Sequence, residues 1–194
     1  MSMQPRLYDV ETALVAPRTL LRRYREGDGA ALHELIQDNS SQLHSYFPEI
    51  LEAVRDKENA ERFVRERLAD WLLQREYAFG LWHAKDAVMI GMVRISELDW
   101  RVPKGRLSFF IAQEYAQQGL MTESLQMAMR FVFHQLQLEK IFIRVTMDNV
   151  AAQRLARKCA FRREGDLRDE FRFPEGELAD VMLFGLTRAE FLGA

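Results

Sequence analysis

A stretch of polar residues between a buried strand and an apolar helix has the features of an anion site. An apolar run ends at Ala112, a short polar loop containing Gly119 follows, and a helical pattern begins after it. The first turn of a helix has N–H groups without intrahelical acceptors, and the helix dipole adds about half a positive charge there. Because glycine has no Cβ, an anion can approach such amides closely. Segment 109–125 therefore predicts a phosphate-binding turn, with a purely conformational role for Gly119 as the plainer alternative.

The other reactive side chains do not form a metal or nucleophile motif. The histidines are His33, His44, His83 and His134, and they lie far apart in the sequence. No Cys/His pair has zinc-ligand spacing, so no metal is expected. The one cysteine, Cys159, falls on the apolar face of a predicted helix, where a packed thiol is expected rather than a nucleophile.

The hydrophobic pattern predicts strands and helices that frame this turn. Alternating or continuous apolar runs predict strands at 18–24, 77–83, 87–98, 107–112, 140–147, 162–173 and 178–186. Helical periodicity begins after an expected Asp28 N-cap, after Asp56, after Gly119 and at 149–159, and a short helix is expected after Pro48. This order predicts one mixed α/β (α+β) domain over residues 1–194, with an antiparallel first half and flanking helices.

Composition narrows the class of protein. The 194 residues are 48% hydrophobic and carry a net charge of -2, with acidic and basic residues interspersed. The absence of a basic stripe argues against nucleic acid as a partner. No apolar run reaches the roughly 20 residues that span a bilayer, and the first ten residues do not form a signal peptide. A soluble, cytoplasmic protein without a membrane partner is therefore expected.

The predicted turn resembles the coenzyme A-binding motif of the GNAT superfamily, within it the RimJ/RimL-like branch. Segment 117–121 (QQGLM) occupies the place of that motif, and Gln117 stands where the family pattern has its first glycine. The resemblance implies that backbone amides hold the coenzyme A pyrophosphate, with the Thr122 side chain as a further donor. The residues that inherit this role are Gln117, Gln118, Gly119, Leu120, Met121 and Thr122.

Two further segments support the resemblance, which covers about residues 16–187. Segment 148–155 followed by 159–161 is similar to the family's second motif, whose Asn contacts the pantetheine arm. Asn149 inherits that role and is also expected to cap the helix. Segments 18–22 and 26–28 are similar to the opening strand and turn of RimJ/RimL proteins.

The resemblance also implies a mechanism. The fourth predicted strand is expected to splay from the fifth, with pantetheine bound between them by the backbone of Phe110, Ile111 and Ala112. The N–H of Phe110 or Ile111 is expected to polarise the thioester oxygen. The acetyl group of acetyl-CoA then passes directly to an amine in a ternary complex, without a metal.

The proton transfers have three candidate residues. Glu97, near the end of the third predicted strand, and Glu164 are candidate general bases, acting directly or through water. A solvated surface carboxylate is the alternative for each. Ser108 is a candidate for contacting the acceptor or protonating the leaving thiolate, and its alternative is a plain strand position.

The acceptor amine stays open at this stage. A peptide N-terminus follows from the RimL-like resemblance, whereas polyamines and aminoglycosides are acceptors of fold-mates. A non-catalytic acyl-CoA-binding or regulatory module is the alternative outside enzymes, and a homodimer is compatible with the resemblance. Fold-level analogy does not choose among these.

Overall fold

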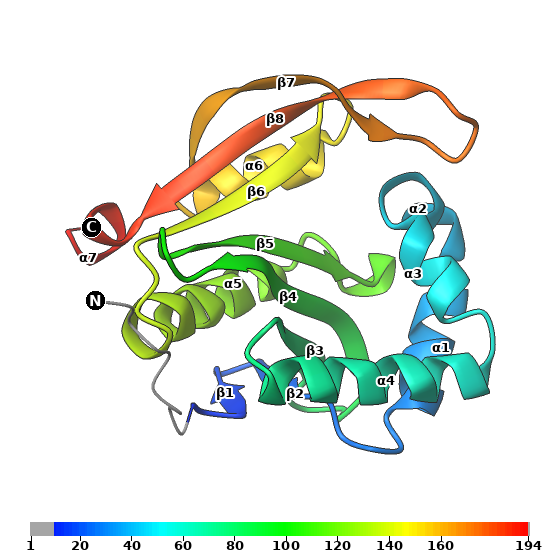
Figure 1. Ribbon diagram of the computed structural model, residues 1–194. Helices are drawn as coiled ribbons and strands as arrows, with labels where there is room; N and C mark the ends of the chain where they lie inside the picture. The colour runs from blue at the N-terminus through cyan, green and yellow to red at the C-terminus, as the bar shows by residue number, and fades with distance from the viewer. Residues whose placement is uncertain (1–9, 194) are drawn as a thin grey trace.

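A computed structural model describes residues 10–193, which form one twisted eight-stranded sheet with helices on both faces (Figure 1). The strands are β1 (Ala13–Val15), β2 (Thr19–Arg23), β3 (Tyr77–His83), β4 (Met89–Asp99), β5 (Lys104–Ile111), β6 (Lys140–Thr146), β7 (Arg162–Arg172) and β8 (Leu178–Thr187). Their order across the sheet is β1-β2-β3-β4-β5-β6-β8-β7. Neighbouring strands are antiparallel except β5 and β6, which are parallel. The mixed, mostly antiparallel sheet predicted from the sequence is thus confirmed.

Helices pack on both faces of the sheet, with one group of helices on each face. The helices are α1 (Gly29–Asp38), α2 (Ser40–Tyr46), α3 (Pro48–Ala53), α4 (Lys57–Leu72), α5 (Leu120–Arg130), α6 (Val150–Lys158) and α7 (Arg188–Leu192). A 3-10 turn (Gln113–Tyr115) precedes α5, and a π-helical turn (Phe131–Gln135) follows it. No helix among residues 10–193 is both long and apolar enough to cross a membrane.

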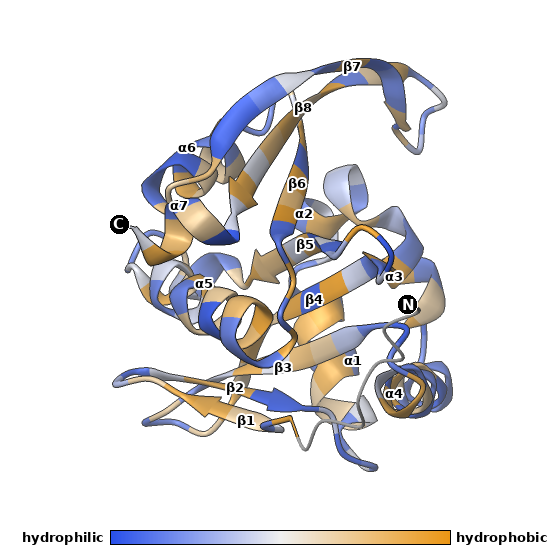
Figure 2. Ribbon diagram, turned by 60° about the vertical axis from the view of Figure 1, so that its left-hand side comes forward, coloured by the Kyte–Doolittle hydropathy of each residue, from blue (hydrophilic) through white to orange (hydrophobic). Residues whose placement is uncertain are grey.

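The strand periodicity explains why both faces of the sheet are covered. Phe79 and Leu81 of β3 belong to the core that contains α5, whereas Ala78 belongs to the core beneath α1–α4. Successive strand residues point to opposite faces, so a strand apolar at every position needs helices on both sides. Figure 2 shows the contrast with β7, which is coloured mainly hydrophilic and lies at the sheet edge.

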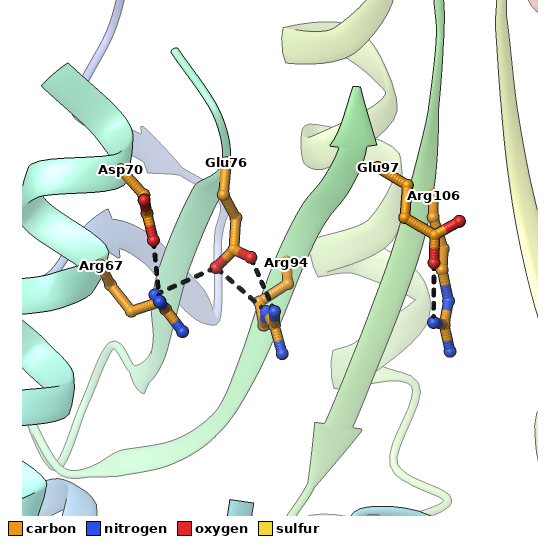
Figure 3. Close-up of polar contacts among 6 residues, drawn as sticks. All are labelled: Arg67, Asp70, Glu76, Arg94, Glu97 and Arg106. Carbon is orange, nitrogen blue, oxygen red and sulfur yellow. Dashed lines mark hydrogen bonds and ion pairs between the residues drawn. The ribbon is translucent and has the colours of Figure 1, made fainter. Parts of the chain in front are cut away.

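A charged cluster fastens α4 to the sheet. Glu76, 7% exposed, accepts hydrogen bonds from Arg94 Nε at 3.1 Å and Nη2 at 2.6 Å. Arg67 of α4 donates to Asp70 at 2.7 Å and lies 3.4 Å from Glu76 (Figure 3). Because the buried carboxylate is paired with two guanidinium groups, its desolvation is compensated.

The parallel pair β5–β6 is short, and the sheet opens beyond it. The paired residues are Lys104 with Lys140, Gly105 with Ile141, and Arg106 with Phe142. The two strands then diverge (Figure 1), while β5 stays paired with β4 and β6 with β8. The predicted splay between these two strands is confirmed, and it creates a split in the middle of the sheet.

The structure contains short elements that were not predicted, and one cap prediction needs correction. Strand β1 and helix α2 were not predicted, because β1 has three residues and α2 buries only Leu43, so neither displays a hydrophobic period. Asp28 is the N-cap residue of α1, as predicted, but its side chain makes no capping hydrogen bond. The Asp28 carboxylate accepts instead from the Arg22 guanidinium at 2.7 and 2.9 Å and from the Arg25 amide at 2.7 Å. A bidentate charged partner is stronger than a neutral backbone donor, so it takes the carboxylate.

Candidate active site

A cavity of about 690 Å³ occupies the split. It is lined by α2, the end of β5, the loop before α5, and α6. Seven of the residues predicted to bind a cofactor line it: Phe110, Ile111, Gln117, Gly119, Met121, Thr122 and Asn149. The remaining three do not. Ala112 and Leu120 are buried in the two cores, and the Gln118 side chain bonds the Glu114 carbonyl at 2.9 Å.

Six consecutive backbone amides at the start of α5 are left out of the hydrogen bonding of the described residues. Within residues 10–193, no backbone or side-chain oxygen accepts a hydrogen bond from the amides of residues 117–122. The first internal bond of the helix runs from Glu123 N to Gly119 O at 3.1 Å. Unused amides at a helix N-terminus favour a bound anion, and this loop offers them in an unbroken series.

Two left-handed residues shape this loop. Gly119 has φ +81°, and Gln117 has φ +60°. A side chain at such a φ costs roughly 1–2 kcal/mol, so the glutamine at the family's first glycine position keeps the backbone geometry under strain. A Cβ at Gly119 would meet only Arg18 Nη2, at 3.5 Å. Gly119 is therefore needed first for its conformation.

Arg18 stabilises the loop through hydrogen bonds. Its guanidinium donates to Gln118 O at 3.0 Å and to Glu123 Oε2 at 3.0 Å, while its backbone N–H donates to Glu123 Oε1 at 2.9 Å. Burial acts to raise the pKa of Glu123, but the hydrogen bonds and charge of Arg18 outweigh it and lower that pKa. The sequence motif at residues 18–22 thus lies against the loop, which the sequence alone did not indicate.

Helix α6 supplies the opposite wall of the cavity and its positive charge. Asn149 caps the helix by accepting from Ala152 N at 3.0 Å, so the predicted cap is confirmed. Arg154 and Lys158 line the cavity from the same helix. The amides, these two cations and the open edge of β5 fit a diphosphate joined to an extended chain of amides.

A second cavity of about 320 Å³ adjoins the first. The two share five lining residues, namely Tyr46, Phe47, Phe109, Asn149 and Ala152. Ser108, predicted to be catalytic, lines the second cavity together with Arg106 and Arg144. Two compartments that meet at common walls can bring two substrates together.

Glu97 is not among the residues that line the second cavity. It sits at an irregularity in the β4–β5 pairing and has φ +50°. Its Oε1 accepts from Arg106 Nη1 at 3.0 Å and from Arg144 Nη1 at 2.9 Å. Figure 3 shows the Glu97 carboxylate turned toward Arg106. Both arginines line the cavity, so Glu97 reaches it through them.

The structure does not bring Glu164 to the cavities. Its Oε2 lies 2.6 Å from Lys140 Nζ, at the start of β6, whereas the second cavity is lined by the end of β6. Cys159 is buried, and burial raises the pKa of its thiol to about 11. A thiol that stays protonated at neutral pH is a poor nucleophile, in agreement with the predicted packing role.

Sequence reasoning missed several polar residues of the cavities. Tyr46 donates to Asp148 Oδ2 at 3.0 Å, and both line the larger cavity. Glu49 and Glu170 line the smaller one. These residues come from α2, α3, β7 and the loop after β6, and no local pattern marks them. Among residues 10–193, no group of three or more His, Cys, Asp or Glu side chains is arranged to hold a metal ion.

Comparisons with known proteins agree with this geometry. Residues 18–162 match the family of acetyltransferase (GNAT) domains. The putative ribosomal N-acetyltransferase YdaF of Bacillus subtilis (strain 168) is 24% identical over 188 residues, covering 94% of this chain and 98% of the relative. The spermidine N(1)-acetyltransferase of Vibrio cholerae serotype O1 is 27% identical over 172 residues, covering 89% of this chain and 94% of the relative.

A solved structure extends the likeness to the fold. Mycobacterium smegmatis RimJ, solved in complex with CoA-disulfide, has a TM-score of 0.83 at 20% identity, covering 97% of this chain and 91% of that one. The loop of free amides, the split sheet and the match over residues 18–162 agree. The chain belongs to the GNAT family of acetyltransferases and is an acetyl-CoA-dependent N-acetyltransferase.

Proposed function

We propose that this enzyme acetylates the α-amine of a peptide or protein N-terminus by direct transfer, as a RimJ/RimL-like acetyltransferase. The observation that carries the proposal is the junction of the two cavities. A donor in the larger cavity and an amine in the smaller one meet at their five shared residues. No nucleophilic side chain is needed between them, because holding two reactants together supplies much of the rate.

The donor is held along the split. The amides of residues 117–122 bind the diphosphate, and Arg154 and Lys158 neutralise its charge. The pantetheine amides pair with the edge of β5 that β6 leaves open, and Asn149 contacts the same arm. The N–H of Phe110 or Ile111 polarises the thioester carbonyl, which carries more negative charge in the transition state than in the ground state.

Protonation of the leaving sulfur is assigned to Tyr46. Tyr46 has the only phenol among the five residues that line both cavities. Ser108, which lines the smaller cavity, has the alternative hydroxyl for this role. Burial first, and then the hydrogen bond to Asp148, raise the pKa of Tyr46, so the phenol holds its proton at neutral pH. Tyr46 gives this proton to the thiolate and regains one from solvent.

The proton of the attacking amine goes to a carboxylate of the acceptor cavity. Glu49 and Glu170 line that cavity and are exposed, so either accepts the proton through water. Glu97 is suited to holding Arg106 and Arg144 in place, because both guanidinium groups already occupy its carboxylate. The general-base roles of Glu97 and Glu164, a cytoplasmic location and a homodimer stay predictions.

Thiol release with acetyl-CoA and a panel of amines tests the proposal. Peptides with a free N-terminus should be consumed, and the same peptides with a blocked N-terminus should not. A thermal shift with coenzyme A alone measures binding separately, since a ligand at a hundred times its Kd stabilises the fold by roughly 2.7 kcal/mol. Binding without turnover on any amine would favour the non-catalytic module.

A further inference from the structure

The acceptor cavity contains a pair of arginines that share one carboxylate. Arg106 of β5 and Arg144 of β6 both donate to Glu97 Oε1, at 3.0 and 2.9 Å, and Arg144 also reaches Oε2 at 3.1 Å. Two positive charges thus meet one negative charge at the point where β5 and β6 diverge. Glu170 of β7 approaches Arg144 Nε only to 3.4 Å. Glu97 and Glu170 together balance the charge of the two arginines, and both arginines line the cavity.

These guanidinium groups retain donors that the protein does not use. Each guanidinium has five N–H groups, and the bonds to Glu97 involve only the two Nη1 atoms. Both Nε atoms are buried and have no hydrogen-bond acceptor among residues 10–193. The side chains are 35% and 28% exposed, so their outer nitrogens remain within reach of a ligand.

Hydroxyl groups beside the arginines add further donors. Ser108 lines the same cavity two residues beyond Arg106 on the same face of β5. Thr146, 6% exposed, lies two residues beyond Arg144 on β6, and its Oγ1 is buried without a partner among the described residues. Ser108 therefore follows Arg106 along the β5 edge of the split, and Thr146 follows Arg144 along the β6 edge. An unpartnered buried hydroxyl is uncommon and marks a place where a ligand or water completes the site.

From this arrangement, and resting on the proposed function, we propose that the acceptor carries a carboxylate close to its reactive amine, bound by Arg106 and Arg144. A planar guanidinium binds a carboxylate through two parallel hydrogen bonds, which gives both strength and orientation. The amine then faces Glu49, which lines the same cavity. A polyamine brings only positive charges and would place them against the two arginines.

The carboxylate has two chemical sources that share this recognition. It is either the α-carboxylate of a free amino acid or an acidic side chain near a peptide N-terminus. The probes are free glutamate, a peptide amide with glutamate at its second position, the same peptide with glutamine there, and spermidine. We expect kcat/KM for at least one carboxylate-bearing probe to exceed that for the glutamine peptide about tenfold or more.

Substitution of the arginines gives the matched test. Arg144→Gln and Arg106→Gln should raise KM for the preferred carboxylate probe about tenfold, so that the ratio of kcat/KM between this probe and the glutamine peptide falls toward one. Arg144→Lys keeps the positive charge but loses the paired N–H donors of the guanidinium. Its KM for the carboxylate probe should therefore lie between those of the wild type and Arg144→Gln. Arg101→Gln is the control, because Arg101 is 94% exposed and lines neither cavity. A thermal melt of each variant reports folding, and the wild-type probe comparison decides the question alone if a variant unfolds.

The outcomes separate this proposal from the proposed function. Equal rates with glutamate and glutamine peptides, with no use of free glutamate, overturn the carboxylate proposal and leave peptide acetylation standing. A preference for spermidine overturns both. Preference for the glutamate peptide supports both proposals, whereas preference for free glutamate supports the carboxylate proposal and overturns the peptide acceptor.

Discussion

The hydroxyl of Tyr46 lies 3.0 Å from Oδ2 of Asp148, and this hydrogen bond crosses the open end of the split sheet. Tyr46 ends α2, which packs with the β1–β5 half, whereas Asp148 follows β6 in the other half. His44 of the same helix lies 3.1 Å from Glu175 in the β7–β8 turn. Helix α2 therefore connects the two halves directly over the place where the cavities meet.

Tyr46→Phe tests the assigned proton donor. The phenyl ring keeps the packing, and only the hydroxyl is lost, so kcat should fall about 100-fold with KM for acetyl-CoA within a factor of about three of wild type. Thiol release at saturating acceptor measures kcat. Tyr115→Phe is the control, because Tyr115 lines neither cavity. An unchanged kcat would assign the sulfur's proton to another donor.

Arg154→Gln tests the charge that the donor cavity presents. Loss of one cation beside the expected phosphates should raise KM for acetyl-CoA about tenfold, since a charge-assisted hydrogen bond contributes roughly 1.5–3 kcal/mol. The acceptor KM should not change. Arg157→Gln is the matched control on the same helix, since Arg157 stacks on Phe184 outside both cavities. Equal effects of the two substitutions would contradict the assigned phosphate position.

Gln117→Gly and Gly119→Ala should change stability in opposite directions. Glycine at φ +60° removes strain and should raise the free energy of unfolding by about 0.5–1 kcal/mol. Alanine at φ +81° adds strain and should lower it by about 1–2 kcal/mol. Urea unfolding of both variants gives these values. Two changes of the same sign would show that the loop relaxes away from this geometry.

Glu123→Gln should destabilise the protein in a pH-dependent way. The folded pKa of Glu123 is lowered, so its stabilisation is complete above the unfolded pKa of about 4.3 and is lost as pH falls through the folded value. At pH 7 the loss should be about 1–2 kcal/mol, and it should shrink steadily below pH ~4. Glu114→Gln, at an exposed carboxylate of the preceding turn, is the control. A pH-independent difference would mean that the Arg18 pairing does not act through charge.

Local sequence patterns accounted for the parts of the site that are local in space. Strand, loop and helix signals follow one another between Phe109 and Leu125, so the amide-rich loop was predictable, and the Asn149 cap depends only on its own helix. The splay followed from family resemblance, since no residue in β5 or β6 marks where pairing stops.

The acceptor side was not predictable for a physical reason. It is assembled from residues far apart in the chain, such as Tyr46, Arg106, Arg144 and Glu170. Their meeting depends on strand register at the Glu97 irregularity and on the placement of α2, which has no hydrophobic period of its own. Glu97 was predicted as a base from its position along a strand, and the sequence carried no sign of its two guanidinium partners.

The brief pairing of β5 with β6 has one more consequence. Beyond Arg106 each strand turns an unpaired edge toward the other, and bare edges ordinarily recruit strands from neighbouring molecules and so promote aggregation. Here the two edges diverge within one molecule, and α2 crosses the opening between them. A strand from another molecule therefore has no straight path along either edge. The narrow, extended pantetheine chain does have a path between the two edges. The fold therefore uses for cofactor binding two strand edges that would otherwise promote aggregation.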